Sequence, residues 1–272
     1  MIELVAEIGI NAGENINTAK KLIDVAVAGG CQYVKFQKRD INLVYTPEEL
    51  TAPRPSPFGK TNGDLKRGLE FGKFEYDEID RYCHQRGIGW FASAWDLNSV
   101  KFLNQYPRCV FHKIASPMLT NMKYLEECVV SGKQTILSTG MSTELEIIKA
   151  VNSLGDTLYA ILHCTSTYPS KPEELNLNYI KALKWTGVKV GFSNHSPGLI
   201  YMPIAVALGA QMIEFHITLD RSSWGSDQAS SIEPEGVMRL AKYIKGVELA
   251  LGDGKKTVYP SEIPIMVKLR RQ

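Results

Sequence analysis

Residues 4–37 have the sequence LVAEIGINAGENINTAKKLIDVAVAGGCQYVKFQ, which contains one complete strand–helix–strand unit. Its two ends, residues 4–10 and 33–37, are short runs rich in apolar side chains, as expected for buried strands. Between them, NTAKKLIDVAVAGG has apolar residues at a helical period and ends in two glycines, a common stop signal of helices. The stretch therefore predicts two parallel strands joined by a helix.

The same alternation continues along the rest of the chain. Further strand-like runs begin near residues 89, 110, 134, 158, 188 and 212, with helical patterns between them and a last helix after Pro234. Eight strands that are each followed by a helix, in about 250 residues, are typical of a (β/α)8 barrel. We predict a single-domain α/β fold, a TIM barrel over residues 1–255. A doubly wound sheet also alternates, but no GxGxxG or GxxxxGK[ST] segment follows the first strand.

Two segments depart from this pattern. Residues 38–73 are polar and rich in proline and glycine, whereas connections in α/β units usually have about 2–6 residues. We expect a long loop there, either a lid or flexible, at the face of the barrel where the strands end. Residues 256–272 finish in the basic sequence KLRRQ, and we expect a solvated C-terminal tail.

Composition excludes several classes of protein. The 272 residues carry a net charge of +2, with 44% hydrophobic and 22% charged residues, which is usual for a soluble globular protein. This charge balance gives no reason to expect a nucleic-acid or membrane partner. Five cysteines without a CxxC pair argue against a disulfide framework and a thiolate zinc site. The N-terminus carries acidic residues early and resembles a strand rather than a signal peptide, so we expect a cytoplasmic protein.

Polar side chains occur near the C-terminal end of almost every predicted strand, although parallel barrel strands should be nearly continuously apolar. They are Glu7, Lys35, Gln37, Ser93, Lys113, Ser116, Ser138, Thr139, His163, Thr165, Ser166, Ser193, Asn194, His195, Glu214 and His216. An unpaired charge inside a barrel is costly, so these groups must meet each other or a ligand. A buried salt-bridge network, for example between Glu7 and Lys35, is one interpretation. We favour a ligand site, because ligands bind at the face where these positions converge.

The kinds of side chain indicate what such a ligand would be. Lys35 and Lys113, together with several hydroxyls, suit a small molecule that carries both a phosphate and a carboxylate. His195 and His216, on neighbouring strands with Glu214 available, suit a divalent metal that keeps positions open for substrate and water. Spacing alone leaves the metal site and two ordinary core histidines about equally open.

Seven segments of the chain resemble the sialic acid synthase (N-acetylneuraminate synthase) family in order and spacing. They are AEIGIN (6–11), VKFQ (34–37), KIAS (113–116), ILSTGM (136–141), HCTSTYP (163–169), GFSNHSPG (191–198) and IEFHITLD (213–220). The resemblance covers nearly the whole chain. It implies a (β/α)8-barrel transferase that needs a divalent metal. Such an enzyme condenses phosphoenolpyruvate with an aldose, giving a 2-keto-3-deoxy sugar acid and phosphate.

The resemblance also implies a role for individual residues. The side chains that match the family's phosphoenolpyruvate-binding groups are Lys35, Ser93, Lys113, Ser116, Ser138 and Ser193. The side chains that match groups beside the reacting atoms or the sugar are Glu7, Gln37, Tyr168 and Asp227, of which we expect Glu7, Gln37 and Asp227 to be catalytic. The residues that match the ligands of the metal, Mn²⁺ or Mg²⁺, are His195 and His216.

The chain departs from the family pattern in three places. Ser166 stands where the family commonly has a substrate-binding asparagine, and Asn194 stands where it often has aspartate before the metal ligand. The family usually continues past the barrel into a small antifreeze-like domain that reaches a partner chain. We expect no such domain in residues 256–272, so a homo-oligomer is left open.

Two other functions are compatible with these residues. A lyase that forms a Schiff base on Lys113 or Lys35 would need no metal and would act on a keto-acid sugar. A barrel that only binds a sugar is the non-enzymatic alternative. Against it, the charged groups Glu7, Lys35, Lys113 and Asp227 are all retained, together with both histidines.

Overall fold

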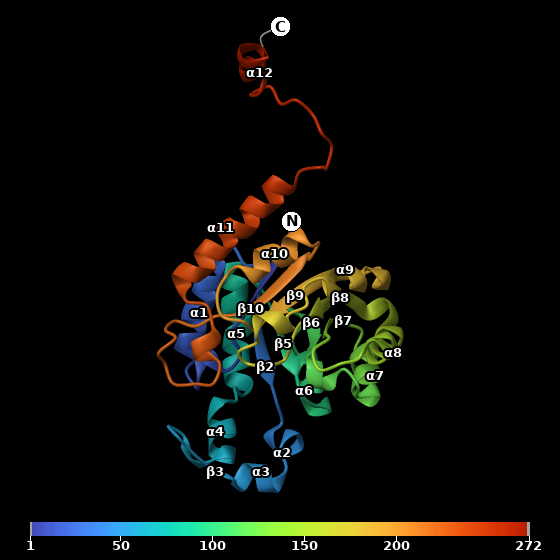
Figure 1. Cartoon of the computed structure of the whole chain (residues 1–272). Coiled ribbons are helices and arrows are strands. Elements are labelled where there is room, and N and C mark those ends of the chain that lie inside the picture. The colour runs from blue at the N-terminus through green and yellow to red at the C-terminus, as the bar shows by residue number, and fades with distance from the viewer. Residues whose placement is uncertain (1, 271–272) are drawn as a thin grey trace.

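Within residues 2–270, which the computed structural model describes, eight parallel strands form a closed barrel at the centre of the molecule (Figure 1). In chain order they are β1 (Glu3–Glu7), β2 (Tyr33–Lys38), β5 (Gly89–Ala94), β6 (Cys109–Ile114), β7 (Gln134–Ser138), β8 (Leu158–His163), β9 (Lys189–Asn194) and β10 (Met212–His216). β1 closes the barrel by pairing with both β10 and β2. The predicted (β/α)8 barrel is confirmed, and every predicted strand run forms a barrel strand.

Helices surround the barrel and pack their apolar faces against it (Figure 1). The helices of this outer layer are α1 (Ile16–Ala28), α5 (Lys73–Arg86), α6 (Leu97–Asn104), α7 (Met122–Val130), α8 (Glu144–Leu154), α9 (Tyr179–Ala182), α10 (Tyr201–Ala207) and α11 (Pro234–Leu251). Short 3₁₀ helices are η1 (Gly9–Ala12), η2 (Ser116–Met118), η3 (Gly155–Thr157), η4 (Pro172–Glu174), η5 (Leu183–Thr186) and η6 (Gln228–Ser230). In α1, the buried residues Ala19, Leu22, Ile23 and Ala26 follow the i, i+3, i+4, i+7 spacing of one helix face.

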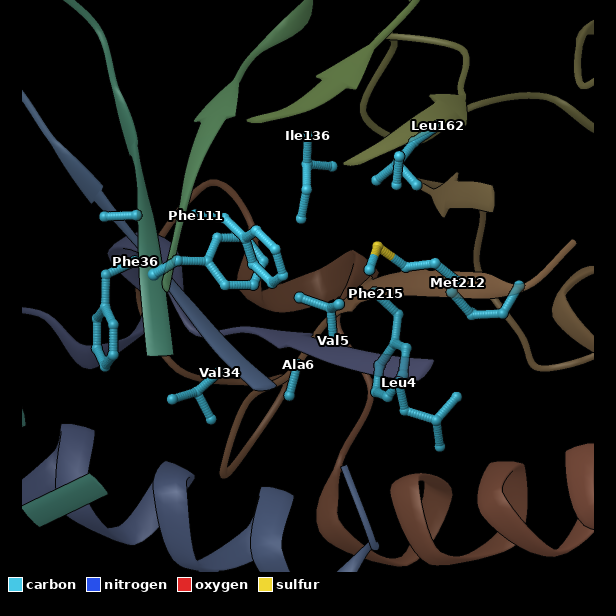
Figure 2. Packing of buried hydrophobic residues seen from close by; sticks show 14 of the residues in the cluster. Leu4, Val5, Ala6, Val34, Phe36, Phe111, Ile136, Leu162, Met212 and Phe215 are labelled. Carbon is cyan, nitrogen blue, oxygen red and sulfur yellow. The ribbon is translucent and has the colours of Figure 1, made fainter. Parts of the chain in front are cut away.

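The two-residue period of the strands separates an outer apolar layer from the barrel interior. Figure 2 shows Val34 and Ala6 directed toward the surrounding helices, and Val5 and Met212 directed toward the middle of the barrel. All four side chains are buried. Alternation along β1 then places Glu7, two residues after Val5, on the inner face of the barrel.

Three aromatic side chains pack together in the N-terminal half of the barrel. The ring centroids of Tyr33, Phe91 and Phe111 lie 5.4–5.8 Å apart in edge-to-face contacts. Lys35, Ser93 and Lys113 lie two residues further along the same strands. These three rings fill the interior near the N-terminal ends of their strands, and we call them the aromatic plug. The polar groups begin two residues closer to the C-terminal ends of the same strands.

Segment 38–73 carries secondary structure of its own, in place of the expected loop. It contains α2 (Ile41–Val44), α3 (Pro47–Thr51), β3 (Pro53–Ser56), β4 (Gly59–Thr61) and α4 (Asn62–Leu69). Capping boxes begin two of these helices, one formed by Thr46 with Glu49 and one by Thr61 with Asp64. The segment projects beyond the C-terminal ends of the strands, at the bottom of Figure 1.

A partly buried ion pair joins the two ends of this segment. The ammonium nitrogen of Lys38 lies 2.7 Å from Oε1 of Glu70. Burial raises the pKa of Glu70, and Lys38 partly opposes that rise. Farther out, the ring of Phe58 packs 6.1 Å from that of Trp224, which precedes η6. The segment is thus fixed at its base and touches the connection between β10 and α11.

The chain leaves the barrel at the end opposite to this segment. The backbone nitrogen of Ile2 donates to Oε1 of Glu248, so the end of α11 lies beside the start of β1. Residues 252–262 extend away and lead to α12 (Ile263–Leu269), which stands apart from the barrel in Figure 1. Ile265 and Val267 of α12 are exposed. Among residues 2–270, no helix combines the length and apolar character that crossing a bilayer requires.

Candidate active site

A cavity of about 180 Å³ opens at the C-terminal end of the barrel. It is lined by Glu7, Lys35, Gln37, Ser93, Trp95, Lys113, Ala115, Ser116, Pro117, Ser138, Met141, Cys164, Ser166, Tyr168, Ser193, His195, Glu214 and His216. Every predicted site residue except Asp227 lies in this lining. Most of the polar groups that interrupt the apolar strands therefore share one space.

The deepest part of the cavity holds two lysines and a carboxylate that they share. Oε1 of Glu214 lies 3.2 Å from Nζ of Lys35, and Oε2 lies 4.0 Å from Nζ of Lys113. Ser193 donates a hydrogen bond to Glu214, and Lys113 donates one of 2.6 Å to Ser138. All of these side chains are buried.

Their charges depend on one another. Burial acts to lower the pKa of Lys35, but Glu214 and Glu7 outweigh it, so the pKa is raised. Burial lowers the pKa of Lys113, against the opposing effect of Glu214. Burial acts to raise the pKa of Glu214, yet the two lysines bring it below its usual range. The carboxylate is thus ionised between its cationic neighbours, an arrangement able to receive an anion.

Glu7 and Gln37 form a second polar pair on the wall beside Lys35. Oε2 of Glu7 lies 3.2 Å from Nζ of Lys35, and Oε1 accepts a 2.6 Å hydrogen bond from Nε2 of Gln37. The salt bridge considered as an alternative to a site is therefore present, and it lines the cavity. Gly9 packs directly on this pair: a Cβ there would lie 2.6 Å from Oε1 of Glu7, and its φ of +47° also favours glycine.

Hydroxyl groups complete the lining near β6 and β7. Oγ of Ser116 accepts a hydrogen bond from the backbone nitrogen of Gly140 and lies 3.3 Å from Sγ of Cys164. A Cβ on Gly140 would lie only 2.1 Å from Oγ of Ser166. A glycine at this position therefore allows the three small polar side chains to approach each other.

The histidines present the features of metal ligands. Nδ1 of His195 lies 2.8 Å from the carbonyl oxygen of Thr165, which requires it to donate and leaves Nε2 as the free acceptor. Nε2 then accepts from the hydroxyl of Tyr168, at 2.9 Å. Burial, reinforced by His216, lowers the pKa of His195 to about 4, so the ring is neutral at pH 7. Metal ligation requires that neutral form.

His216 faces the same part of the cavity. Its ring centroid lies 5.7 Å from that of His195. Its Nδ1 is buried without a hydrogen-bond partner and lies 3.6 Å from Oδ2 of Asp227. In the described part of the chain, no three His, Cys, Asp or Glu side chains are grouped to hold an ion by themselves. The two imidazoles thus fit a divalent ion that also takes oxygen ligands from substrate or water.

Asp227 and Tyr168 lie toward the outer part of the site. Asp227 does not line the cavity, but its carboxylate is next to His216. Its backbone oxygen accepts hydrogen bonds from Ser230 and Ser231, which fix the loop before α11. The side chain of Tyr168 is half exposed.

Some strand-end groups lie outside the cavity. Nε2 of His163 bonds to the carbonyl oxygen of Leu175, and the amide of Asn194 bonds to Ser196. The hydroxyls of Thr139 and Thr165 bond to backbone oxygens. These side chains form hydrogen bonds within the protein and do not line the cavity.

The sequence analysis missed several lining residues. Trp95, Met141 and Cys164 follow strand ends closely, which is the signal that could have found them. Met141 is exposed and has a positive φ of 58°, an uncommon conformation for a side-chain-bearing residue. The sequence places Glu214 near His195 and His216 as a possible metal ligand. In the structure its carboxylate contacts Lys35 and Lys113.

The fold and cavity together define a class: a (β/α)8-barrel enzyme with a polar site at the C-terminal face of the barrel. The NeuB family model matches residues 22–256 of the chain. The chain belongs to the NeuB family, and it is a transferase of the sugar acid synthase type.

Individual relatives agree with this assignment. The chain is 35% identical to N-acetylneuraminate-9-phosphate synthase of Homo sapiens, over 98% of this chain and 76% of the relative. It is 34% identical to N,N'-diacetyllegionaminic acid synthase of Campylobacter jejuni, over 95% of this chain and 80% of the relative. Among solved structures, the N-acetylneuraminic acid synthetase of Leptospira borgpetersenii, in complex with citrate, matches with a TM-score of 0.86. That match has 30% identity and covers 100% of this chain and 93% of the other.

Proposed function

We propose that this enzyme condenses phosphoenolpyruvate with the open-chain form of an aldose, giving a 2-keto-3-deoxy sugar acid and inorganic phosphate. The observation that carries the proposal is the floor of the cavity, where Lys35 and Lys113 share Glu214 beside the two imidazoles. A small molecule with both a phosphate and a carboxylate matches two buried ammonium groups surrounded by hydroxyl donors. The relatives named above support a sialic acid-like product.

We assign the phosphoenolpyruvate contacts to the deep part of the cavity. Lys35 and Lys113 provide the cationic donors. The neutral donors are Ser93, Ser116, Ser138 and Ser193. Charge-assisted hydrogen bonds from buried lysines are stronger than those from water-exposed groups, so the anion is held before and after its charge redistributes.

The reaction joins C3 of phosphoenolpyruvate to the aldehyde carbon of the sugar. C2 then carries positive charge until water adds to it, and the C2–O bond to phosphate breaks to leave a ketone. One proton of the water goes to the former aldehyde oxygen, and the second leaves with the phosphate as hydrogen phosphate when the C2–O bond breaks. We assign to Glu7, with Gln37 beside it, the tasks of taking up the water proton and stabilising the charge at C2.

The acceptor aldose belongs on the outer side of the cavity. We assign contacts with it to Tyr168, Ser166 and Asp227, since Tyr168 and Ser166 line the cavity and Asp227 lies beside His216. His195 and His216 would hold a divalent ion, Mn²⁺ or Mg²⁺. Such an ion would act as a Lewis acid toward the aldehyde oxygen of the sugar.

Phosphate release tests this proposal directly. Purified enzyme is incubated with phosphoenolpyruvate and one of a panel of acceptors: N-acetylmannosamine, a diacetamido hexose, mannose and their phosphorylated forms. Each reaction is run with and without Mn²⁺ or Mg²⁺. We expect phosphate release that depends on both an acceptor and the metal, together with a keto acid identified by mass spectrometry. Absence of release with every acceptor would overturn the proposal.

A second function is favoured by one observation, the lowered pKa of Lys113, which burial causes. An amine of this kind can form a Schiff base with a keto acid. Borohydride reduction in the presence of pyruvate separates the two functions. Covalent trapping on Lys113 supports the lyase, whereas metal-dependent phosphate release without trapping supports the condensation.

We place the enzyme in the cytoplasm. Its five cysteines, Cys31, Cys83, Cys109, Cys128 and Cys164, are all free and buried. Free thiols in this number are usual in a reducing compartment.

A further inference from the structure

The side chain of Arg39, outside the cavity lining, contacts the polar pair formed by Glu7 and Gln37. Arg39 follows the end of β2, two residues after Gln37, and does not line the cavity. Its Nη2 nevertheless donates a hydrogen bond to Oε1 of Gln37. Nε2 of Gln37 in turn donates to Oε1 of Glu7. The three side chains form one chain of directed hydrogen bonds that ends on the buried carboxylate.

The direction of these bonds is fixed from both ends of the amide of Gln37. A glutamine amide can rotate by half a turn and present either its oxygen or its NH₂ group to a neighbour. A guanidinium group only donates, so Gln37 must turn its oxygen toward Arg39. Its NH₂ group then points to Glu7, which needs a donor. Glu7 only accepts and selects the same orientation of the amide, while the guanidinium holds the oxygen end of the amide in place.

Arg39 is itself held by neighbouring elements. Its guanidinium carbon lies 4.4 Å from the ring centroid of Trp95, a stacking arrangement that arginine favours. The backbone nitrogen of Trp95 donates to the carbonyl oxygen of Lys38, which ties the residue after β5 to the end of β2. The backbone nitrogen of Arg39 donates to Glu70. The donor is therefore mounted on two adjacent strand ends rather than on a free loop.

We propose that Arg39, stacked on Trp95, is a positioning residue that fixes the amide of Gln37 and, through it, the carboxylate of Glu7. The inference rests on the proposed function, since it concerns the carboxylate assigned to the water and C2 steps. Arg39 has no direct contact with Lys35 or Lys113, and Glu7 stands between it and Lys35. We therefore expect it to affect the rate of the chemical step more than the binding of phosphoenolpyruvate.

The test is a double-mutant cycle with steady-state phosphate release as the readout. Arg39→Met keeps an unbranched apolar stem against Trp95 but removes the donors. We expect it to lower kcat at least about tenfold, as loss of a general-base group's alignment does, with KM for phosphoenolpyruvate changed less than about twofold. Arg39→Lys, which restores one donor, should give an intermediate kcat.

The Gln37→Leu background shows whether Arg39 acts through Gln37. There, Arg39→Met should change kcat by less than about twofold, because coupled residues are not additive. Arg108→Met is the matched control, since Arg108 forms an exposed ion pair with Asp80 and is not in the cavity lining. It should leave kcat and KM unchanged.

The outcomes separate the two proposals. An equal loss in both backgrounds, or no loss in either, overturns the role of Arg39 while leaving the condensation intact. A raised KM with unchanged kcat overturns it as well. A wild-type enzyme that releases no phosphate with any acceptor overturns the proposed function and this inference together. If Arg39→Met does not fold, as judged by its melting curve, Arg39→Lys in both backgrounds decides the question.

Discussion

The carboxylate of Glu214 lies 3.2 Å from the ammonium nitrogen of Lys35, and both side chains are buried at the floor of the cavity. The second carboxylate oxygen faces Lys113. A carboxylate placed between two buried cations compensates their charges.

Replacing Glu214 by Gln should destabilise the folded protein by about 3 kcal/mol, because buried Lys113 then loses its carboxylate partner and Lys35 keeps only Glu7. Phosphoenolpyruvate or inorganic phosphate should restore part of this loss by supplying the missing negative charge. Denaturant unfolding with and without the anion measures both effects. Glu173→Gln, at an exposed position, is the control and should change neither quantity.

Removal of the Lys113 side chain should weaken phosphoenolpyruvate binding. Lys113→Ala deletes a charge-assisted contact worth about 1.5–3 kcal/mol, which corresponds to a roughly 10- to 150-fold rise in Kd. Isothermal titration measures the change, and Lys123→Ala on the exposed face of α7 is the control. A Kd equal to that of the wild type would contradict the assignment of Lys113 to this ligand.

The histidine pair is tested apart from turnover by metal binding. His195→Ala or His216→Ala should abolish phosphate release and should also remove the rise in melting temperature that we expect Mn²⁺ to cause in the wild type with phosphoenolpyruvate present. His84→Ala, at an exposed position, should retain both. Retention of the Mn²⁺ effect in both cavity variants would show that the ion binds elsewhere.

Stability should fall between pH 6.5 and pH 4 because of His112. Burial lowers the pKa of His112 to about 4, against an ordinary value of 6.5. The unfolded chain therefore binds a proton in this interval that the folded chain does not, so the stabilisation is complete above pH 6.5 and declines as pH falls. The shift corresponds to about 3 kcal/mol at most.

His112→Gln should flatten this part of the stability curve, because glutamine does not titrate. Its amide can still donate to Asn104, as Nε2 of His112 does. Urea unfolding at pH 7.5, 6 and 5 measures the slope. His84→Gln should leave the slope as it is in the wild type. A slope unaffected by His112→Gln would assign the acid sensitivity to other groups.

The ion pair between Lys38 and Glu70 should hold segment 38–73 in place. Glu70→Gln removes the charge but keeps the shape, and the partly buried Lys38 then loses its counter-charge. We expect faster backbone hydrogen exchange confined to residues 41–69, with little change in the barrel strands. Lys60→Met, on the exposed hairpin, is the control. Uniformly faster exchange over the whole chain would argue instead for a global loss of stability.

The barrel and most of the cavity could be predicted from the sequence because both depend on local periodicity. Strand runs such as residues 33–37 place alternate side chains inside, and polar groups at those alternate positions mark the site. The helices of segment 38–73 were also recognisable in principle, since Thr46 with Glu49 and Thr61 with Asp64 have the spacing of capping boxes.

Other features depend on contacts between distant parts of the chain. Glu214 meets Lys35 only because β1 pairs with both β10 and β2, and no local pattern states that pairing. The stacking of Arg39 on Trp95 joins the ends of β2 and β5 through side chains whose orientation the sequence does not encode locally. These contacts required three-dimensional coordinates.

The aromatic plug formed by Tyr33, Phe91 and Phe111 lies on the N-terminal side of the cavity. A molecule bound to Lys35 and Lys113 would therefore enter and leave by the opening beside Tyr168. In the proposed reaction we therefore expect phosphoenolpyruvate to bind before the sugar, because a sugar in this opening would block its path. The closed N-terminal side of the cavity thus predicts an ordered mechanism.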